Sequence, residues 1–550
     1  MTQKIKYSLL FILLGAVFFI PFLGRVHLFD WDEINFAECS REMVIMKDYL
    51  RVYINFETFW EKPPFFFWMQ AIAMHTFGIN EFSARLPNAI CGIITLVLLF
   101  NIGSRLYDNK FGLIWAGAYL GSVLPHLYFR SGIIDPFFNL FIFLGLYLFI
   151  QFYWKKEGFT NIRFTRSQYF YLIAAGLMVG FGILTKGPVA YLIIGLTLFV
   201  YWVLQRFRLY ISIPQFLLFS LAASLITLAW YGTVTAVHGS WFITEFTKYQ
   251  YRLFSTPDAG HGGFPGYHFV VLLVGCFPAS IFCIRGFFKT DQPYLYQRDF
   301  KVWMVILFWV VLILFTIVKS KIVHYSSMCY FPLTYLAALT VYQILEKKIS
   351  FNGWMKFGLV FIASLFGLAT IALPFLAQHI DILRPLFSKD PFAAANLDAK
   401  VHWTGWEATA GVFLLAITGL SIRWISKNKL ELGFKALFGG TAVFVMLTLT
   451  FFIARIELYS QGAAIRFYES LQGKDVYVAP FEFRTYADLF YTHKQPNQVI
   501  PHPDQLLHGN LDKDLYMVSK IMDADQLRAL PDFKEIRSEN GFVFFVRKKK

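Results

Sequence analysis

Acidic side chains are concentrated in one stretch of the sequence, from Phe29 to Gln70, between two long apolar segments. Asp32 and Glu33 are adjacent near its start, and another acid, Asp135, follows in the segment RSGIIDPFFN. A carboxylate in such a position can act as a general base toward an acceptor hydroxyl, or it can orient a cation or a sugar. An ordinary solvated loop acid is the alternative. Idle charges at the ends of apolar segments are costly, which favours the catalytic interpretation.

Several cations accompany these acids near the ends of apolar segments. They are Lys62, Arg130, Lys186, Arg252 and Lys321. A cluster of Lys and Arg at that depth is suited to binding a phosphate or pyrophosphate group at a membrane surface. Snorkelling toward lipid headgroups is the alternative for any one of them. Five together favour an anionic substrate.

Two histidines and an acid form a candidate site for a divalent cation. Glu61 lies in the first charged stretch, while His261 and His268 lie in or beside the segment AGHGGFPGYHF. The spacing of seven between the histidines matches no known metal motif, so polar loop histidines are the alternative. A divalent cation therefore stays an open expectation.

The elements that must position these residues are membrane spans. Of the 550 residues, 57% are hydrophobic and 15% are charged, whereas soluble domains carry about 25% charged residues. Apolar runs of crossing length, about 17–25 residues, predict about thirteen spans. They lie near residues 7–23, 88–103, 112–129, 137–154, 169–185, 188–205, 214–231, 268–286, 302–318, 326–345, 356–375, 405–424 and 435–453.

Basic residues fall mainly in alternate short connections, such as Arg206/Arg208 and Lys347/Lys348. The positive-inside rule places these connections in the cytoplasm. The same rule accounts for the net charge of +15 without a nucleic-acid partner. The long loops 24–87, 232–267 and 376–404 then lie on the opposite side, together with the acids and cations described above. A shared extracytoplasmic site is the simplest interpretation.

Two segments outside the spans have patterns of their own. Residues 33–49 form an amphipathic helix candidate that could lie flat along the membrane interface. Residues 456–550 alternate helical and strand patterns, and the turn signal Glu539-Asn540-Gly541 predicts a terminal hairpin. We therefore predict a membrane domain over 1–455 and a small extracytoplasmic α/β domain over 456–550. A structural cap is the expected role of the latter.

The motifs FDWDEINFAECSREM and WEKPPFFFW resemble the first extracytoplasmic loop of polyprenyl-phosphate-dependent glycosyltransferases of the protein O-mannosyltransferase superfamily. The similarity is closest to the lipid A aminoarabinose transferase (ArnT-like) branch. It continues through the Asp135 segment, the motif LTKGP, the outer loop with His261 and Pro265, and the motif SKIVHYSSMCYFP.

The resemblance implies a polytopic α-helical GT-C fold and a sugar donor carried on undecaprenyl phosphate or a similar lipid. It assigns Asp32 as the acceptor-facing catalytic carboxylate and Asp135 as a second essential acid, with Glu33 beside them. By the resemblance, Glu61 and Lys62 line the central cavity, and Lys186, Lys321 and Tyr325 contact the donor phosphate. Arg130, Arg252 and His324, which reach the same face, are the other expected substrate-binding residues. The implied reaction is inverting displacement at the anomeric carbon, with the lipid phosphate as leaving group.

The acceptor is left open between lipid A or another envelope glycolipid and a protein hydroxyl. A hydroxyl acceptor needs a base, whereas a lipid A phosphate is already ionised and does not. The implied location is the bacterial inner membrane, with the site on the periplasmic side, and a monomer would suffice. A secondary transporter is the alternative from another class, but its paired interrupted helices and small exterior are not indicated here.

Overall fold

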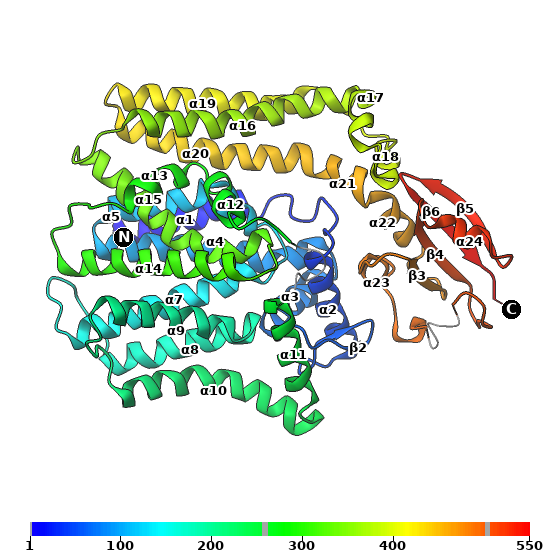
Figure 1. The fold of residues 1–550 in the computed structure, drawn as a ribbon, viewed down its shortest axis with the longest axis horizontal. Helices are drawn as coiled ribbons and strands as arrows, with labels where there is room; N and C mark the ends of the chain where they lie inside the picture. Colours follow the sequence, from blue (N-terminus) through cyan, green and yellow to red (C-terminus); the bar gives the residue numbers. More distant parts are fainter. Residues whose placement is uncertain (1–2, 256–261, 501–505, 550) are drawn as a thin grey trace.

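The computed structural model describes residues 3–255, 262–500 and 506–549. Long helices form a bundle, and the end of the chain forms a small sheet to one side of it (Figure 1). The longer helices are α1 (Gln3–Phe19), α4 (Glu81–Leu106), α5 (Asn109–Leu120), α7 (Asp135–Lys156), α8 (Gln168–Lys186), α9 (Val189–Leu204), α10 (Ile213–His238), α11 (Trp241–Ser255), α14 (Leu295–Ile317), α15 (Tyr330–Leu345), α16 (Gly353–Gln378), α19 (Thr409–Ser426) and α20 (Leu430–Thr448).

Every apolar run predicted from the sequence coincides with a helix or a pair of helices. Within the described ranges, nine helices are long and apolar enough to cross a membrane. A tenth span results if α12 (Tyr267–Gly275) and α13 (Ala279–Gly286), which are bent by 115° around Pro278, count as one. Of the other three runs, one forms α1 with 17 residues, one forms α9 with 16, and one is split into α5 and α6 (Val123–Tyr128).

The helix predicted to lie along the membrane interface is buried instead. Helix α2 (Asp32–Met46) has every residue from Glu33 to Met43 buried. One side contacts α3 (Phe65–Phe77), and another contacts α23 (Ala487–Phe490) from the end of the chain. Figure 1 shows α2 between the bundle and the sheet. The interfacial prediction was wrong because the sequence pattern around α2 did not reveal that a segment more than 400 residues away covers it.

The strands predicted after residue 456 are present. They form a four-stranded sheet in the order β3-β4-β6-β5, with β3 and β4 parallel and the other pairs antiparallel. The predicted hairpin joins β5 and β6 through Asn540 and Gly541, both at positive φ. The elements are α21 (Ala454–Ser460), α22 (Gly462–Glu469), β3 (Tyr477–Phe481), α23, β4 (Leu515–Lys520), α24 (Ala524–Arg528), β5 (Phe533–Glu539) and β6 (Phe542–Arg547). A two-stranded ribbon, β1 (Tyr53–Ile54) and β2 (Glu57–Thr58), lies in the first loop.

Short elements connect the rest. The turn of 3-10 helix η2 (Val323–Cys329) leads into α15 and packs against α7, α12 and α14. The loop between α16 and α19 contains α17 (Ile380–Leu383), η3 (Arg384–Phe387), α18 (Pro391–Asn396) and η4 (Trp406–Ala408). A π-helical turn, η5 (Leu449–Ile453), joins α20 to α21, and η6 (Pro496–Gln498) precedes β4.

Candidate active site

A cavity of 1810 Å³ lies where the first loop meets the ends of the bundle helices. Its walls come from the start of α2, the ends of α7 and α8, helix α11, turn η2 and the segment after β3. Most of the sequence-predicted residues line it: Asp32, Glu33, Glu61, Lys62, Arg130, Asp135, Lys186, Arg252, His324 and Tyr325. Segments distant in the sequence therefore converge on one space, as the shared-site interpretation expected.

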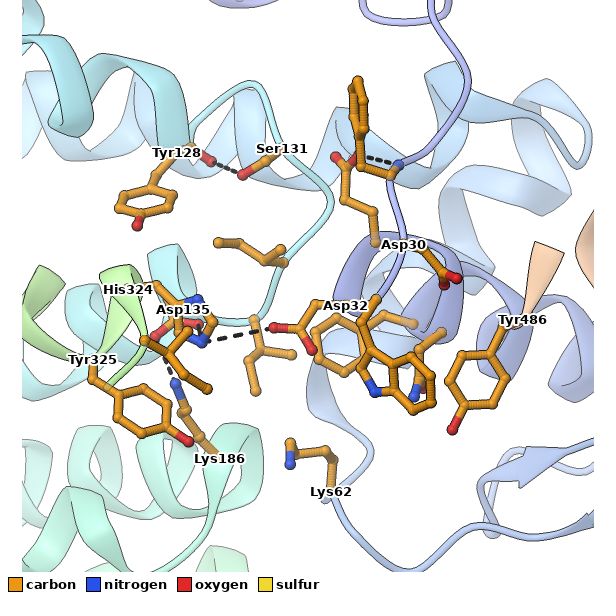
Figure 2. Close-up of a pocket in the computed structure, with 18 of the residues that line it drawn as sticks. Asp30, Asp32, Lys62, Tyr128, Ser131, Asp135, Lys186, His324, Tyr325 and Tyr486 are labelled. Atoms are coloured by element: carbon orange, nitrogen blue, oxygen red, sulfur yellow. Dashed lines mark hydrogen bonds and ion pairs between the residues drawn. The ribbon is translucent and has the colours of Figure 1, made fainter. Parts of the chain in front are cut away.

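Four charged or titratable side chains form a continuous row along this cavity (Figure 2). The Lys186 ammonium donates to Asp135 Oδ1 at 2.6 Å. His324 Nε2 lies 4.0 Å from Asp135 Oδ2 and 3.6 Å from Asp32 Oδ2. The helices favour the first pair, because Asp135 opens α7 and Lys186 closes α8, where the helix dipoles stabilise an anion and a cation respectively.

The two acids of the row differ in access. The Asp32 side chain is 37% exposed, whereas that of Asp135 is 3% exposed and bound to Lys186. A proton acceptor must reach the substrate, while a buried paired carboxylate can only orient its neighbours or a bound sugar. This geometry makes Asp32 the better candidate for the base.

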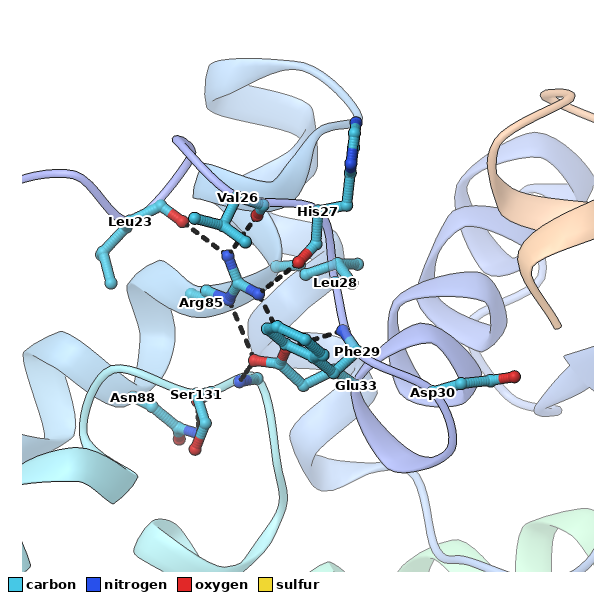
Figure 3. Close-up of polar contacts among 12 residues, drawn as sticks. Leu23, Val26, His27, Leu28, Phe29, Asp30, Glu33, Arg85, Asn88 and Ser131 are labelled. Atoms are coloured by element: carbon cyan, nitrogen blue, oxygen red, sulfur yellow. Dashed lines mark hydrogen bonds and ion pairs between the residues drawn. The ribbon is translucent and has the colours of Figure 1, made fainter. Parts of the chain in front are cut away.

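Glu33, which the sequence suggested as catalytic, occupies a structural position (Figure 3). Its carboxylate accepts from Arg85 Nε at 2.9 Å and from Arg85 Nη2 at 2.7 Å. The backbone amides of Phe29 and Gly132 donate to it at 3.0 and 2.6 Å. Burial alone would raise the pKa of Glu33, but the Arg85 charge and these hydrogen bonds hold it below its ordinary value. With both oxygens occupied, Glu33 fixes the start of α2 and thereby orients Asp32.

A second group of polar residues lines the cavity near α11. Lys62 Nζ donates to the Tyr249 hydroxyl at 2.8 Å and lies 4.6 Å from its ring centroid. The Arg252 guanidinium is 5.2 Å from the same ring. Two cations around one phenol can bind an anionic group such as a phosphate. Tyr325 also lines the cavity, with Lys186 Nζ 5.2 Å from its ring centroid.

Two predicted cations have their donors engaged by the backbone. Arg130 lines the cavity, but its Nη1 and Nη2 donate to the carbonyls of Phe18 at 2.8 Å and Pro21 at 2.6 Å. Lys321 is not part of the cavity wall, and its ammonium donates to carbonyls at the end of α14, including Phe315 at 3.0 Å. Burial lowers the pKa of Lys321. Both side chains hold helix ends, as a lysine or arginine near a C-terminus commonly does.

The predicted metal ligands are not brought together within the described ranges. Glu61 lines the cavity, whereas His268 is fully buried on α12 and does not. His261 lies outside the described residues. No group of three or more metal-ligating side chains occurs in residues 3–255, 262–500 and 506–549.

The end of the chain contributes residues that sequence reasoning missed. Arg484, Thr485 and Tyr486 line the cavity, and the Tyr486 ring packs 4.6 Å from that of Trp31. Asp30 accepts hydrogen bonds from Thr485 and Tyr486, but burial raises its pKa to about 6. Asp30 had a local signal beside Asp32. No local sequence signal pointed to residues 484–486, because only tertiary packing brings them to the cavity.

Comparisons with known proteins support the resemblance read from the sequence. A family model for dolichyl-phosphate-mannose-protein mannosyltransferases matches residues 61–231. An undecaprenyl phosphate-alpha-4-amino-4-deoxy-L-arabinose arabinosyl transferase of Pectobacterium atrosepticum is 26% identical over 424 residues, which cover 75% of this chain and 72% of that protein. A relative of the same name from Pseudomonas fluorescens is 27% identical over 403 residues, covering 71% and 68%.

The fold agrees with the same relationship. A crystal structure of ArnT from Cupriavidus metallidurans bound to undecaprenyl phosphate superposes with a TM-score of 0.78, covering 98% of both chains at 16% identity. The apo state of that protein gives a TM-score of 0.74, covering 99% of this chain and 98% of the other. The chain therefore has the polytopic membrane fold of the GT-C class, and the predicted resemblance to ArnT-like transferases is confirmed.

Proposed function

Because the chain shares the fold of ArnT and resembles polyprenyl-phosphate-dependent transferases in sequence, we propose that it is a membrane glycosyltransferase. It moves a sugar from a polyprenyl phosphate, such as undecaprenyl phosphate, to an envelope glycolipid. The observation that carries this proposal is the row Lys186, Asp135, His324 and Asp32, which lines one cavity together with the cations Lys62 and Arg252.

The proposed reaction is a direct displacement at the anomeric carbon. Lys62 and Arg252 bind the donor phosphate and stabilise the charge that grows on it as the carbon–oxygen bond breaks. Asp135, held by Lys186, orients the sugar. Asp32 faces the incoming acceptor, whose oxygen attacks the opposite side of the anomeric carbon, so the configuration inverts.

We place the site on the extracytoplasmic side of a bacterial inner membrane. The support is the distribution of basic loops, because Arg206/Arg208 and Lys347/Lys348 mark the opposite end of the bundle. The sheet of residues 477–547 then forms an extracytoplasmic domain, and residues 480 and 483–486 of this domain form part of the cavity wall. Labelling of single cysteines by an impermeant thiol reagent, one introduced at Glu57 and one at Lys347, tests this orientation.

A requirement for a divalent cation remains a proposal, and the reaction described above does not depend on it. Transfer assayed with and without a chelator decides whether one is required.

The test of the function uses membranes containing the protein and a polyprenyl phosphate with a radiolabelled sugar. We expect label to enter the glycolipid fraction with the wild type and to stay on the donor with Asp32→Asn and Asp135→Asn. Glu57→Gln is the matched control, since Glu57 is an exposed acid in the same loop. Label that stays on the donor with the wild type would contradict the proposal, and label in protein would reassign the acceptor.

A further inference from the structure

A buried contact between α2 and the extracytoplasmic domain contains more acids than bases. Helix α2 contributes Glu38, Arg41 and Glu42, and the domain contributes Asp488 on α23 and Lys494 just after it. All five residues are at most 5% exposed. Three acids therefore accompany two bases, and the fully ionised contact would carry one negative charge in excess. Because an uncompensated buried charge is costly, the contact favours retaining a proton.

The hydrogen bonds of this contact leave part of the acids unsatisfied. Arg41 binds Glu38 through both Nε and Nη2, at 2.7 and 2.6 Å. The Phe56 amide donates to Glu42 Oε2 at 2.7 Å. Glu42 Oε1 and Asp488 Oδ1 are buried and accept no hydrogen bond from the part of the chain that the structure describes. These two carboxyl groups are therefore the ones at which a proton removes the excess charge.

The bases around the contact do not compensate both acids. Arg41 is paired with Glu38, and Lys494 Nζ donates to Asn55 Oδ1 at 2.7 Å, which ties the domain to the first loop. His493 is neutral near pH 7, because burial and the neighbouring Arg41 lower its pKa. The other titratable groups around the contact are Asp30, Cys39, Glu61, Glu81, Tyr468 and Glu469. Groups of these types carry no positive charge in either protonation state.

The direction of the proton affinity follows from this environment. Burial and the neighbouring Glu38 raise the pKa of Glu42. Burial also raises the pKa of Asp488 to about 7, although Lys494 opposes the change. A carboxyl group in water has a pKa of about 4. Docking of the domain therefore takes up protons, and the docking equilibrium weakens as the pH rises from about 4 through 7 and, because of Glu42, beyond. Each proton taken up weakens it by at most about tenfold per pH unit.

The contact adjoins one wall of the cavity. Asp488 follows Tyr486 by two positions, and residues 483–486 line the cavity. The Tyr486 ring packs 4.6 Å from that of Trp31, which also lines it. A shift of α23 away from α2 therefore moves this wall and separates the two rings.

We propose that Asp488 and Glu42 are positioning residues that dock the extracytoplasmic domain onto α2 by holding at least one proton, and that release of this proton to water displaces the cavity wall of residues 483–486. Neither side chain lines the cavity, so neither acts on the substrate directly. The effect on sugar transfer rests on the function proposed above, whereas docking can be measured without any substrate.

The first measurement is the distance between two spin labels in the full-length protein in lipid nanodiscs. One label is attached at Glu57→Cys in the first loop and the other at Lys534→Cys on β5. Both positions are exposed, and the five native cysteines are buried. We expect one narrow distance distribution at about pH 6 and a second population that grows between about pH 7 and pH 9. A wild-type distribution that stays the same over this range overturns the inference.

Two neutral variants, Asp488→Asn and Glu42→Gln, are then compared in the same assay. Since neither new side chain ionises, each variant should keep the narrow distribution to a pH about one unit higher than the wild type. Asp525→Asn is the matched control, because Asp525 is an acid of the same domain whose side chain is 88% exposed. It should follow the wild type. Neutral variants that open at the same pH as the wild type overturn the inference.

The second measurement is the pH profile of sugar transfer for the same variants. We expect the wild-type rate to fall at least about tenfold between about pH 7 and pH 9, and the alkaline limb of Asp488→Asn to move up by about one unit. A lower rate at every pH with an unchanged profile assigns Asp488 a purely structural role and overturns the inference. Absence of transfer by the wild type at every pH overturns the proposed function instead, while the spin-label distances still decide the docking.

Discussion

The buried pair of Glu33 and Arg85 gives a prediction that separates a structural acid from a reacting one. Arg85 donates two hydrogen bonds to Glu33 and three to the carbonyls of Leu23, Val26 and His27, at 2.7 to 3.0 Å. Both side chains are less than a tenth exposed. Figure 3 shows the guanidinium enclosed by these acceptors.

Glu33→Gln removes the negative charge and leaves a buried guanidinium without its counter-ion. Losing one partner of a buried ion pair costs about 3–5 kcal/mol, because the remaining charge is no longer compensated. The amide NH2 also replaces one of the two acceptor oxygens, so it opposes the backbone N–H of either Phe29 or Gly132. We therefore expect the free energy of unfolding in detergent to fall by about that amount. Adding Arg85→Gln should restore part of it, and the double-mutant cycle measures the coupling.

The pH dependence has a defined direction. The pKa of Glu33 is held below its ordinary value by Arg85 and the backbone amides, which overcome the effect of burial. Its contribution is therefore complete above the ordinary pKa of glutamate, about 4.3, and is lost as the pH falls through the lower folded value. Wild-type stability should drop below about pH 4, and Glu33→Gln should lack this drop.

The assay pairs unfolding in detergent with sugar transfer, and Glu57→Gln serves as the control from the same loop. Loss of stability with transfer reduced only in proportion to the folded fraction supports a purely structural role for Glu33. A Glu33→Gln variant as stable as wild type that transfers no sugar would refute the reasoning and return Glu33 to the reacting groups.

Three further predictions address other parts of the cavity. Asp135→Asn should reduce kcat at least about 100-fold at unchanged expression, because Lys186 loses its counter-charge and the sugar loses an oriented acceptor. Lys62→Met should raise the donor KM about tenfold, which corresponds to the loss of one charge-assisted hydrogen bond of about 1.5 kcal/mol. Lys248→Met, on the exposed face of α11, is the control and should leave the donor KM unchanged. Asp30→Asn should raise Tm at pH 7 but not at pH 4. Burial raises the pKa of Asp30 to about 6, so the free energy of unfolding falls as the carboxyl ionises between about pH 4 and pH 6.

Hydropathy predicted where the helices would be, because each long apolar run has to form its own backbone hydrogen bonds in a membrane. The proline after Asp135 and the glycine and proline after Lys186 indicated that both residues lie at helix ends. The two residues meet because α7 and α8 are adjacent in space as well as in sequence. Local pattern was sufficient for this part of the site.

Local pattern could not decide what each charge contacts. Lys321 and Lys186 both end apolar runs, yet the first reaches back to its own helix carbonyls and the second reaches an acid on a neighbouring helix. The same uncertainty affected Glu33 beside Asp32. Consecutive positions at the start of a helix point in different directions, so one carboxylate meets Arg85 and the other meets the cavity. Neighbouring residues in the sequence can therefore have different surroundings in the structure.

The division of the charges into held and accessible ones explains how a few side chains can act in a largely apolar protein. Glu33, Arg85 and Arg130 have their polar atoms engaged by other groups of the chain and keep the cavity walls in place. Asp32 and Lys62 border the cavity, where Asp32 Oδ2 lies 3.6 Å from His324 Nε2 and Lys62 donates to the Tyr249 hydroxyl. Fixed charges around them cost no reorganisation during the reaction, which is the condition under which electrostatic stabilisation is most effective. Rigid support, rather than the number of charges, therefore determines where the chemistry takes place.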